Sequence, residues 1–233
     1  MRPYLDPRDH AFANGPVFPR PASIAAAREL FDDAADAERL MEVFAAFDRG
    51  ADAGEGLRLG LGARLLTPNG ERRARIGRDC ALRGIIRCED AGEVALGDRV
   101  YLGDDALISV RSRVEVGQGT LIAHGAQVFD NDTHPLDPAE REAHFRVILK
   151  LAPGRDFDIA TAPVRIGARC WLGLHSLVMK GVAIGETSVV AAGAVVMRDA
   201  PPGVIVAGNP ARVVRRLDGS GRRSGLAALF GGR

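Results

Sequence analysis

The stretch VRIGARCWLGLHSLVMKGVAIGETSVVAAGAVVMRD, residues 164–199, places a branched aliphatic residue at every sixth position. These residues are Ile166, Leu172, Val178, Ile184, Val190 and Val196. A period of six does not fit a helix, but it is typical of a parallel β-helix, in which each unit forms one short strand and one turn. Three units then close a triangular coil, and each aliphatic side chain stacks inward on its copy in the next coil.

Two further columns keep the same period. The residues that directly follow the aliphatics are mostly small, with glycine at 167, 173 and 185. Compact residues stand four places after the aliphatics: Cys170, Ser176, Val182, Ser188, Ala194 and Ala200. We expect these compact side chains to fill the tight corners of the triangle, with glycine where a turn needs positive φ.

A related signal begins further upstream. Ile76, Leu96 and Val116 are each followed by glycine and lie twenty residues apart, which corresponds to one coil plus two residues. The sequence therefore predicts an all-β solenoid domain over residues 76–217. One long loop, residues 129–163, interrupts it, and loops of this length are usually functional or disordered.

The flanking segments differ from the repeats. Residues 21–50 have apolar residues at helical spacing after a possible cap at Ser23, so residues 1–75 are expected to form a helical appendage and linker. We expect its one or two helices to pack as a lid on the first coil, with residues 51–56 as the linker. Residues 218–233 are glycine-rich and are expected to form a flexible tail.

The composition narrows the class of protein. The 31 Lys and Arg residues nearly balance the 30 Asp and Glu residues, which gives no case for nucleic-acid or membrane binding. The three cysteines form no CxxC pair, so neither a disulfide framework nor a thiolate zinc site is expected, and the cytoplasm is the expected location. No signal peptide and no membrane-spanning segment are expected either.

Two motifs carry a family resemblance. NDTHPLDP (131–138) and VVAAGAVVMRDAPPGVIVAGNPARVVRRL (189–217) together resemble the maltose and galactoside O-acetyltransferase group of hexapeptide-repeat acyltransferases. The resemblance covers about residues 76–217. It implies a left-handed β-helix, assembly as a homotrimer with active sites between subunits, acetyl-CoA as co-substrate, and no resident metal.

The resemblance also implies roles for individual residues. His134 would be the general base that takes the proton of an acceptor hydroxyl, as that oxygen attacks the thioester directly. The backbone amides of Leu174 and Ala192 would bind coenzyme A, and the Leu174 amide would also stabilise the oxyanion. Basic side chains that match the nucleotide end are Arg198, Arg212 and Arg215. Without the resemblance, NDTHP would be interpreted as a polar turn and RVVRR as a solvated basic end.

An imidazole base needs a partner on its other ring nitrogen. Four carboxylates are close enough in sequence to serve, and the sequence does not rank them: Asp132, Asp137, Glu140 and Glu142. His124 and His175 stand at positions that do not point inward, which favours a solvated face of the solenoid. The pattern assigns no role to His10 or His144.

The sequence therefore predicts an acetyl-CoA-dependent O-acetyltransferase acting on a hydroxyl of a sugar or glycan precursor. The residues leave open N-acetylation of a nucleotide-linked amino sugar, and a non-catalytic solenoid scaffold. A zinc hydratase on the same fold would need closely spaced histidine ligands, whereas the nearest histidines here, at 124, 134 and 144, are ten residues apart. The long loop and the N-terminal region depart from the maltose-type enzymes, so the acceptor stays open.

Overall fold

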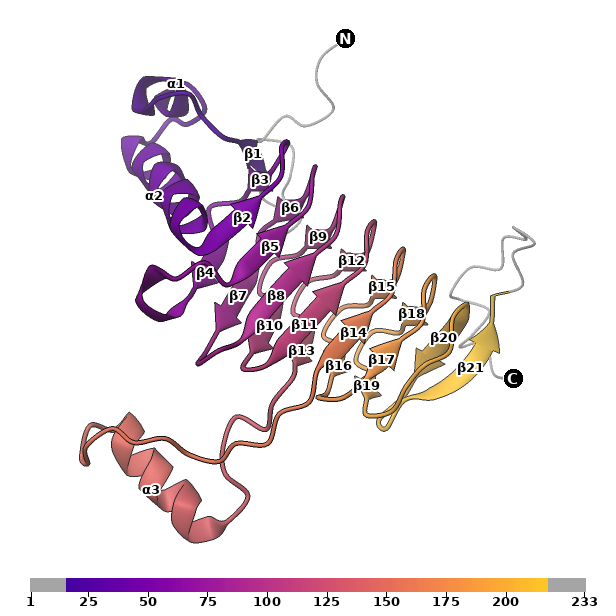
Figure 1. Cartoon of the computed structure of the whole chain (residues 1–233). Coiled ribbons are helices and arrows are strands. Elements are labelled where there is room, and N and C mark those ends of the chain that lie inside the picture. Colours follow the sequence, from indigo (N-terminus) through magenta and orange to yellow (C-terminus); the bar gives the residue numbers. More distant parts are fainter. Residues whose placement is uncertain (1–15, 218–233) are drawn as a thin grey trace.

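The computed structural model describes residues 16–217 and shows a three-sided parallel β-helix, with helices at its N-terminal end and one projecting segment (Figure 1). Sheet A contains, in spatial order, β1 (Phe18–Pro19), β3 (Arg58–Leu59), β6 (Ala81–Leu82), β9 (Tyr101–Leu102), β12 (Leu121–Ile122), β15 (Trp171–Leu172), β18 (Val189–Val190), β20 (Val204–Ala207) and β21 (Arg212–Arg216). The pairings β1–β3 and β20–β21 are antiparallel, and the others within sheet A are parallel.

Two six-stranded parallel sheets form the other sides. Sheet B contains β2 (Ala51–Ala53), β5 (Ala74–Ile76), β8 (Glu93–Leu96), β11 (Arg113–Val116), β14 (Val164–Ile166) and β17 (Ala183–Ile184). Sheet C contains β4 (Arg64–Leu66), β7 (Ile85–Cys88), β10 (Leu107–Val110), β13 (Gln127–Phe129), β16 (Leu177–Val178) and β19 (Val195–Val196). The chain visits sheets B, A and C in turn, so each circuit adds one strand to every side.

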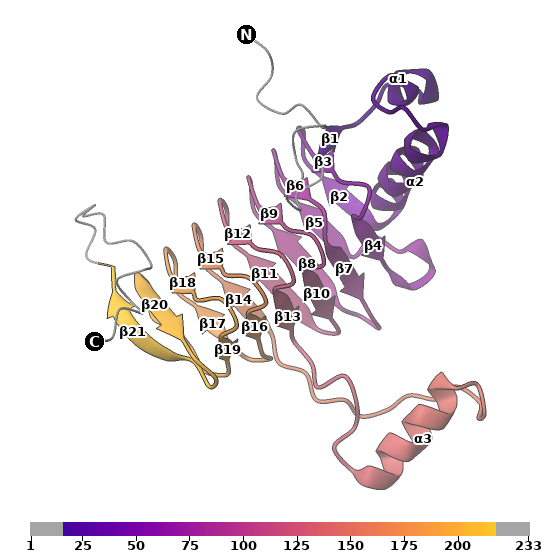
Figure 2. The same cartoon turned by 180° about the vertical axis from the view of Figure 1, so that it is seen from behind.

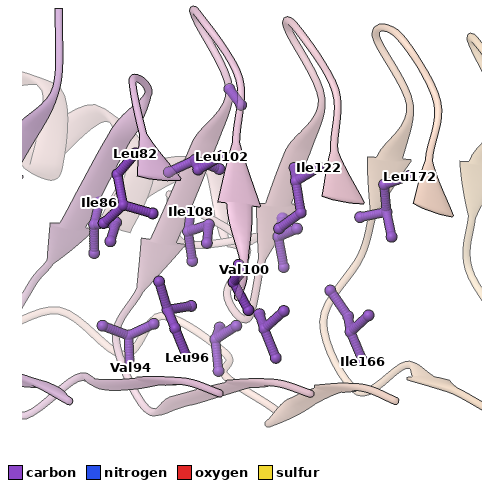
Figure 3. Close-up of a cluster of buried hydrophobic side chains, with 14 of the residues drawn as sticks. Leu82, Ile86, Val94, Leu96, Val100, Leu102, Ile108, Ile122, Ile166 and Leu172 are labelled. Atoms are coloured by element: carbon purple, nitrogen blue, oxygen red, sulfur yellow. The ribbon is translucent and has the colours of Figure 1, made fainter. Parts of the chain in front are cut away.

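The strand register confirms the six-residue period. Ile166 pairs with Ile184, Leu172 with Val190, and Val178 with Val196, which stacks each aliphatic on its copy one coil away. The same stacking relates Ile76, Leu96 and Val116 in sheet B. All these side chains are buried and line the axis of the prism, as Figure 3 shows for the central coils. Burial of this continuous aliphatic column is the main stabilising term of such a fold.

The compact residues fill the corners as predicted. Cys170, Ser176 and Ser188 are each no more than 1% exposed. Two polar corner residues hydrogen-bond to the backbone: Ser188 Oγ donates to the Pro201 carbonyl at 2.8 Å, and Thr120 Oγ1 donates to the Gly167 carbonyl at 2.9 Å. Small side chains are required because the backbone turns sharply at each corner, and a larger group would occupy the space of the aliphatic column.

The N-terminal helices form the predicted lid. α1 (Ile24–Arg28) begins at Ser23, whose Oγ accepts a hydrogen bond from the Ala26 amide at 3.2 Å. α2 (Ala34–Gly50) then buries Leu40, Phe44 and Phe47 against the first coil. These large side chains cover the apolar end of the prism, which would otherwise face water.

The β-helix begins earlier than the sequence predicts. Residues 51–56, expected to be a linker, include β2, which pairs with β5 in sheet B. The first coil therefore lies within residues 51–75 and not in an appendage. A 3₁₀ turn, η1 (Pro68–Gly70), lengthens the connection from β4 to β5, so that Ala51 is the partner of Ala74. This extra length removes the regular period from the sequence.

The predicted long loop is a structured segment, here called the arm (residues 130–163). It leaves the prism after β13, contains α3 (Pro138–Ile148), and returns to β14. Figures 1 and 2 show α3 standing away from the prism, below the coils in both views. The predicted tail, residues 218–233, lies outside the described residues. Over residues 16–217, no helix is long and apolar enough to cross a bilayer.

Candidate active site

The base of the arm is built around a buried carboxylate. Asp130 is fully buried, and its two oxygens accept the amide hydrogens of Arg111 at 2.8 Å and Ser112 at 2.7 Å. Asn131, also buried, donates from Nδ2 to Asp130 at 3.0 Å and accepts the Thr133 amide at 2.9 Å. These bonds fix the first residues of the arm against the preceding coil, so His134 stands on a defined backbone.

The far side of the base is tied to the next coil. Lys180, in the turn after β16, donates from Nζ to Asp132 Oδ1 at 2.7 Å. The Gly181 amide donates to the Ala162 carbonyl at 3.0 Å, on the returning strand of the arm. These bonds hold both ends of the arm where it joins the prism. We call this region, around Asp132, Ala162 and Lys180, the neck of the arm.

Helix α3 holds the segment that contains His134. Asp137 caps the helix by accepting the Glu140 amide at 2.9 Å, and Pro138 occupies its first turn. Arg141 then reaches back and donates from Nη1 to the carbonyls of Pro135 at 3.2 Å and Leu136 at 2.8 Å. The His-Pro-Leu segment is thus fixed on the first turns of the helix that follows it.

The His134 ring is exposed, and His144 is its polar partner. The two Nδ1 atoms lie 3.1 Å apart, and the ring centroids are 5.1 Å apart. Across residues 16–217, none of the four carboxylates proposed as partners contacts the His134 ring. Asp132 pairs with Lys180, Asp137 caps α3, and Glu140 binds Arg155.

His144 is supported from behind. Its ring packs on Phe157 with centroids 4.6 Å apart, and the Arg155 guanidinium covers the Phe157 ring at 4.2 Å. Partial burial lowers the pKa of His144 below its usual value, and the charges of His134 and Arg111 act in the same direction, whereas Glu89 opposes them. The lowered pKa favours the neutral form of His144.

A row of free amides lies at another edge of the prism, the corner where sheet A turns into sheet C. Its turns are residues 103–106, 123–126, 173–176 and 191–194. In the last three turns, the amide of the third residue donates to a carbonyl of the previous coil: Gly125 to Asp104 at 2.9 Å, His175 to His124 at 3.0 Å, and Gly193 to Leu174 at 2.8 Å. These third residues have positive φ, including 53° at His175.

The second residue of the two last turns has a free backbone amide. In the described part of the chain, the amides of Leu174 and Ala192 have no hydrogen-bond acceptor, and both residues are exposed. A Cβ at Gly173 would lie 2.7 Å from Ala192 N, so the glycine before Leu174 keeps the neighbouring amide open. These two donors belong to exposed residues on adjacent turns, one coil or about 4.8 Å apart.

The other histidines of this corner have structural roles. His124 Nδ1 accepts the Asp104 amide at 3.1 Å, which satisfies the corresponding amide of an earlier turn. The His175 ring lies over Gly125, where an added Cβ would meet Nδ1 at 2.3 Å. Neither side chain points into the prism, as the sequence predicts.

The three arginines do not form one cluster. Arg212 and Arg215 lie on β21, the last strand of sheet A, whereas Arg198 is exposed in the turn after β19, at a different corner. None of the three has an ion pair within residues 16–217. Arg212 and Arg215 can therefore bind an anion at the end of sheet A without first losing a carboxylate partner.

One chain does not bring its predicted site residues together. The arm connects sheet C to sheet B, whereas the Leu174 and Ala192 turns connect sheet A to sheet C. A groove of about 800 Å³ follows the glycine column of sheet B and contains none of the predicted site residues. Within one chain, His134 and the free amides therefore belong to different corners of the prism.

Comparison with known proteins identifies the family. Residues 163–198 match the hexapeptide repeat of succinyl-transferase. Nodulation protein L of Rhizobium meliloti is 35% identical over 138 residues, which are 59% of this chain and 68% of that protein. The chain belongs to the hexapeptide-repeat acetyltransferases. It is therefore an acyltransferase by family, and the predicted family is confirmed.

Other relatives share a smaller part of their length. A candidate acetyltransferase of Saccharomyces cerevisiae is 32% identical over 130 residues, which are 56% of this chain and 59% of the yeast protein. Among solved structures, an N-acyltransferase (AntD) from Bacillus cereus, crystallised with dTDP-4-amino-4,6-dideoxyglucose and coenzyme A, has a TM-score of 0.56. It is 17% identical, and the match covers 71% of this chain and 83% of that one. This likeness shows the shared fold.

His144 is the residue that sequence reasoning missed. Its ten-residue spacing from His134 was visible, but nothing in the local pattern places the two rings together, because α3 must fold back first. The brace formed by Asp130 and Asn131 was missed for the same reason: its partners lie about twenty residues upstream, one coil away.

Proposed function

We propose that this protein transfers an acetyl group from acetyl-CoA to a hydroxyl of a sugar or glycan precursor, with His134 as the general base. The observation that supports this most is that the described residues offer both an exposed imidazole on a fixed backbone and, at another corner, unpartnered amides on adjacent turns. Membership of the acetyltransferase family supplies the reaction class.

The proposed chemistry needs a base and an oxyanion site. His134 Nε2 takes the proton of the acceptor hydroxyl while that oxygen attacks the thioester carbonyl carbon. The Leu174 amide donates to the carbonyl oxygen as it becomes negative. Collapse of the tetrahedral intermediate breaks the carbon–sulfur bond, and the proton passes from His134 to the leaving thiolate.

Coenzyme A would lie along the sheet A–sheet C corner. Amide groups in its pantetheine arm can pair with the free amide of Ala192, and its phosphates suit the guanidinium groups of Arg212 and Arg215. Arg198 stands at another corner and would contact the nucleotide only if that end crosses the top of the prism. No bound metal enters this scheme.

We further propose that the active unit is a homotrimer with each site between two chains. The arm exposes five large apolar side chains that its own chain does not cover: Leu136 (77%), Phe145 (56%), Ile148 (52%), Leu149 (49%) and Leu151 (66%). Exposed apolar surface of this extent marks a contact with another molecule. An arm that packs on a neighbouring prism would also carry His134 to that neighbour's free amides.

The decisive test is His134→Ala, assayed by release of free thiol from acetyl-CoA with a panel of sugar acceptors. We expect kcat to fall by at least about 100-fold, which is the contribution of a general base. Arg39→Ala, at an exposed position of helix α2 and outside the proposed site, is the control, and its activity should stay close to wild type. Full turnover by His134→Ala would favour the scaffold interpretation.

The acceptor panel should include amino sugars linked to nucleotides. Preferential transfer to an amine would change the assignment to N-acetylation while keeping the donor site. Light scattering at several concentrations tests the assembly: we expect a trimer, and an active, monodisperse monomer would exclude the intersubunit site.

A further inference from the structure

The orientation of His134 depends on a second histidine. We propose that His144 is a positioning residue that accepts the Nδ1–H of His134, so that the free lone pair of His134 stands on Nε2. This inference rests on the proposed role of His134 as the base. It identifies the partner of the second ring nitrogen of His134, which the sequence could not choose among the four nearby carboxylates.

The contact allows two proton arrangements. Either His134 carries its proton on Nδ1 and donates to His144, or His144 carries it and donates to His134. Because His134 Nδ1 faces His144, Nε2 is the ring nitrogen left for an acceptor hydroxyl. A base at Nε2 must be unprotonated there, so a neutral His134 must carry its proton on Nδ1, and His144 must be the acceptor.

The surroundings of His144 favour this arrangement. A partner that accepts must be neutral, and partial burial lowers the pKa of His144, which favours that form. Its ring is fixed between α3 and Phe157, and the Arg155–Glu140 pair at 3.0 and 2.9 Å closes the far side. The His144 ring is therefore already held in one orientation, and it does not have to reorganise when His134 becomes protonated.

The same arrangement stabilises the reacting state. When His134 accepts the hydroxyl proton, it becomes an imidazolium whose Nδ1–H bond to His144 is charge-assisted and stronger. A carboxylate could also accept the Nδ1–H of His134, but the nearby Asp132 instead accepts a hydrogen bond from Lys180 at 2.7 Å. A neutral partner orients His134 without holding a proton on it as tightly as a carboxylate would.

Three substitutions separate orientation from packing. His144→Phe keeps an aromatic ring against Phe157 but has no acceptor. His144→Asn loses the ring but can place its Oδ1 near the position of the lost Nδ1. His144→Ala removes both. We expect kcat to fall about tenfold or more in the Phe and Ala variants, with KM for acetyl-CoA unchanged, and to recover to within a few-fold in the Asn variant.

The most direct readout does not need activity. Long-range ¹H–¹⁵N correlation spectra of histidine-labelled protein distinguish the two tautomers, and His134→Ala assigns the signal. We expect the Nδ1–H tautomer of His134 in wild type, and the Nε2–H form that free histidine favours in His144→Phe. The spectra are recorded at one pH, because the charges of Arg111 and Glu89 on the prism also act on His144.

The outcomes distinguish the two proposals. An Nε2–H tautomer in wild type, or full activity of His144→Phe while His134→Ala is inactive, would overturn the role of His144 and leave the base in place. Full activity of His134→Ala would overturn the proposed function, whatever tautomer the spectra show.

Discussion

The close stacking of the coils can be tested at a single glycine. Gly117 lies at the corner between sheets B and A, and a Cβ there would stand 2.4 Å from Ala168 N and 2.6 Å from Gly167 C. Both contacts are to backbone atoms, which cannot rotate away. Relief requires the two coils to separate by about 1 Å, because interiors are packed to van der Waals contact.

That separation would break hydrogen bonds of the coil ladder. The Gly117 amide donates to the Ile166 carbonyl at 2.7 Å, and Thr120 Oγ1 donates to the Gly167 carbonyl at 2.9 Å across the same gap. Losing two such bonds at about 1 kcal/mol each, together with about 1–3 kcal/mol for overpacking, predicts that Gly117→Ala lowers the free energy of unfolding by about 3–5 kcal/mol.

Gly193→Ala is the matched control. Gly193 also lies in a coil turn, but no atom stands within 4 Å of its added Cβ, so only its φ of +68° opposes the substitution. We expect a cost of about 1–2 kcal/mol there. Guanidinium unfolding followed by circular dichroism, at one fixed protomer concentration, measures both. If Gly117→Ala is no more destabilising than Gly193→Ala, the stacking argument is wrong.

Four further predictions concern the site and its support. Leu174→Pro removes the proposed oxyanion donor at a turn position that tolerates proline, so kcat should fall about 10²–10³-fold, whereas Leu174→Ala keeps the amide and should stay near wild type in the thiol-release assay. Asp130→Ala leaves two buried amides unpaired, and denaturant titration should show a loss of about 2–4 kcal/mol. Burial raises the pKa of the Cys88 thiol to about 12, so it stays protonated at pH 8 and should react with a thiol reagent only after denaturation; rapid labelling of the native protein would contradict this. Replacing Arg212 and Arg215 together by alanine should raise KM for acetyl-CoA about tenfold but leave KM for acetyl-pantetheine unchanged, because only the former carries the nucleotide phosphates.

Much of the fold follows from local sequence, because the period of six is a local constraint. Each coil must place an aliphatic residue inward at the same point, so Ile166, Leu172 and Val178 reveal the three sides without knowledge of their partners. The first coil was not predicted because the η1 turn lengthens it. Its inward side chains are still buried, but the extra residues interrupt the six-residue period of the sequence.

The site was predictable only in part. The motif around His134 and the exposed turn at Leu174 could be located, because each depends on a short segment. The contact between His134 and His144 could not, since it depends on the path by which α3 returns toward the neck of the arm. The same reason explains why the sequence suggested carboxylates as partners of His134. Asp132 and Glu140 are near His134 in the sequence, but their side chains pair with Lys180 and Arg155.

Hybrid trimers test the central claim most directly, that His134 of one chain acts at the Leu174 amide of another. His134→Ala and Leu174→Pro chains are each expected to be inactive alone. When they are mixed equally and assembled at random, about one site in four combines an intact His134 with an intact Leu174 from the neighbouring chain. We predict that the mixture recovers about a quarter of wild-type activity. A mixture as inactive as its two components would contradict a site shared between chains.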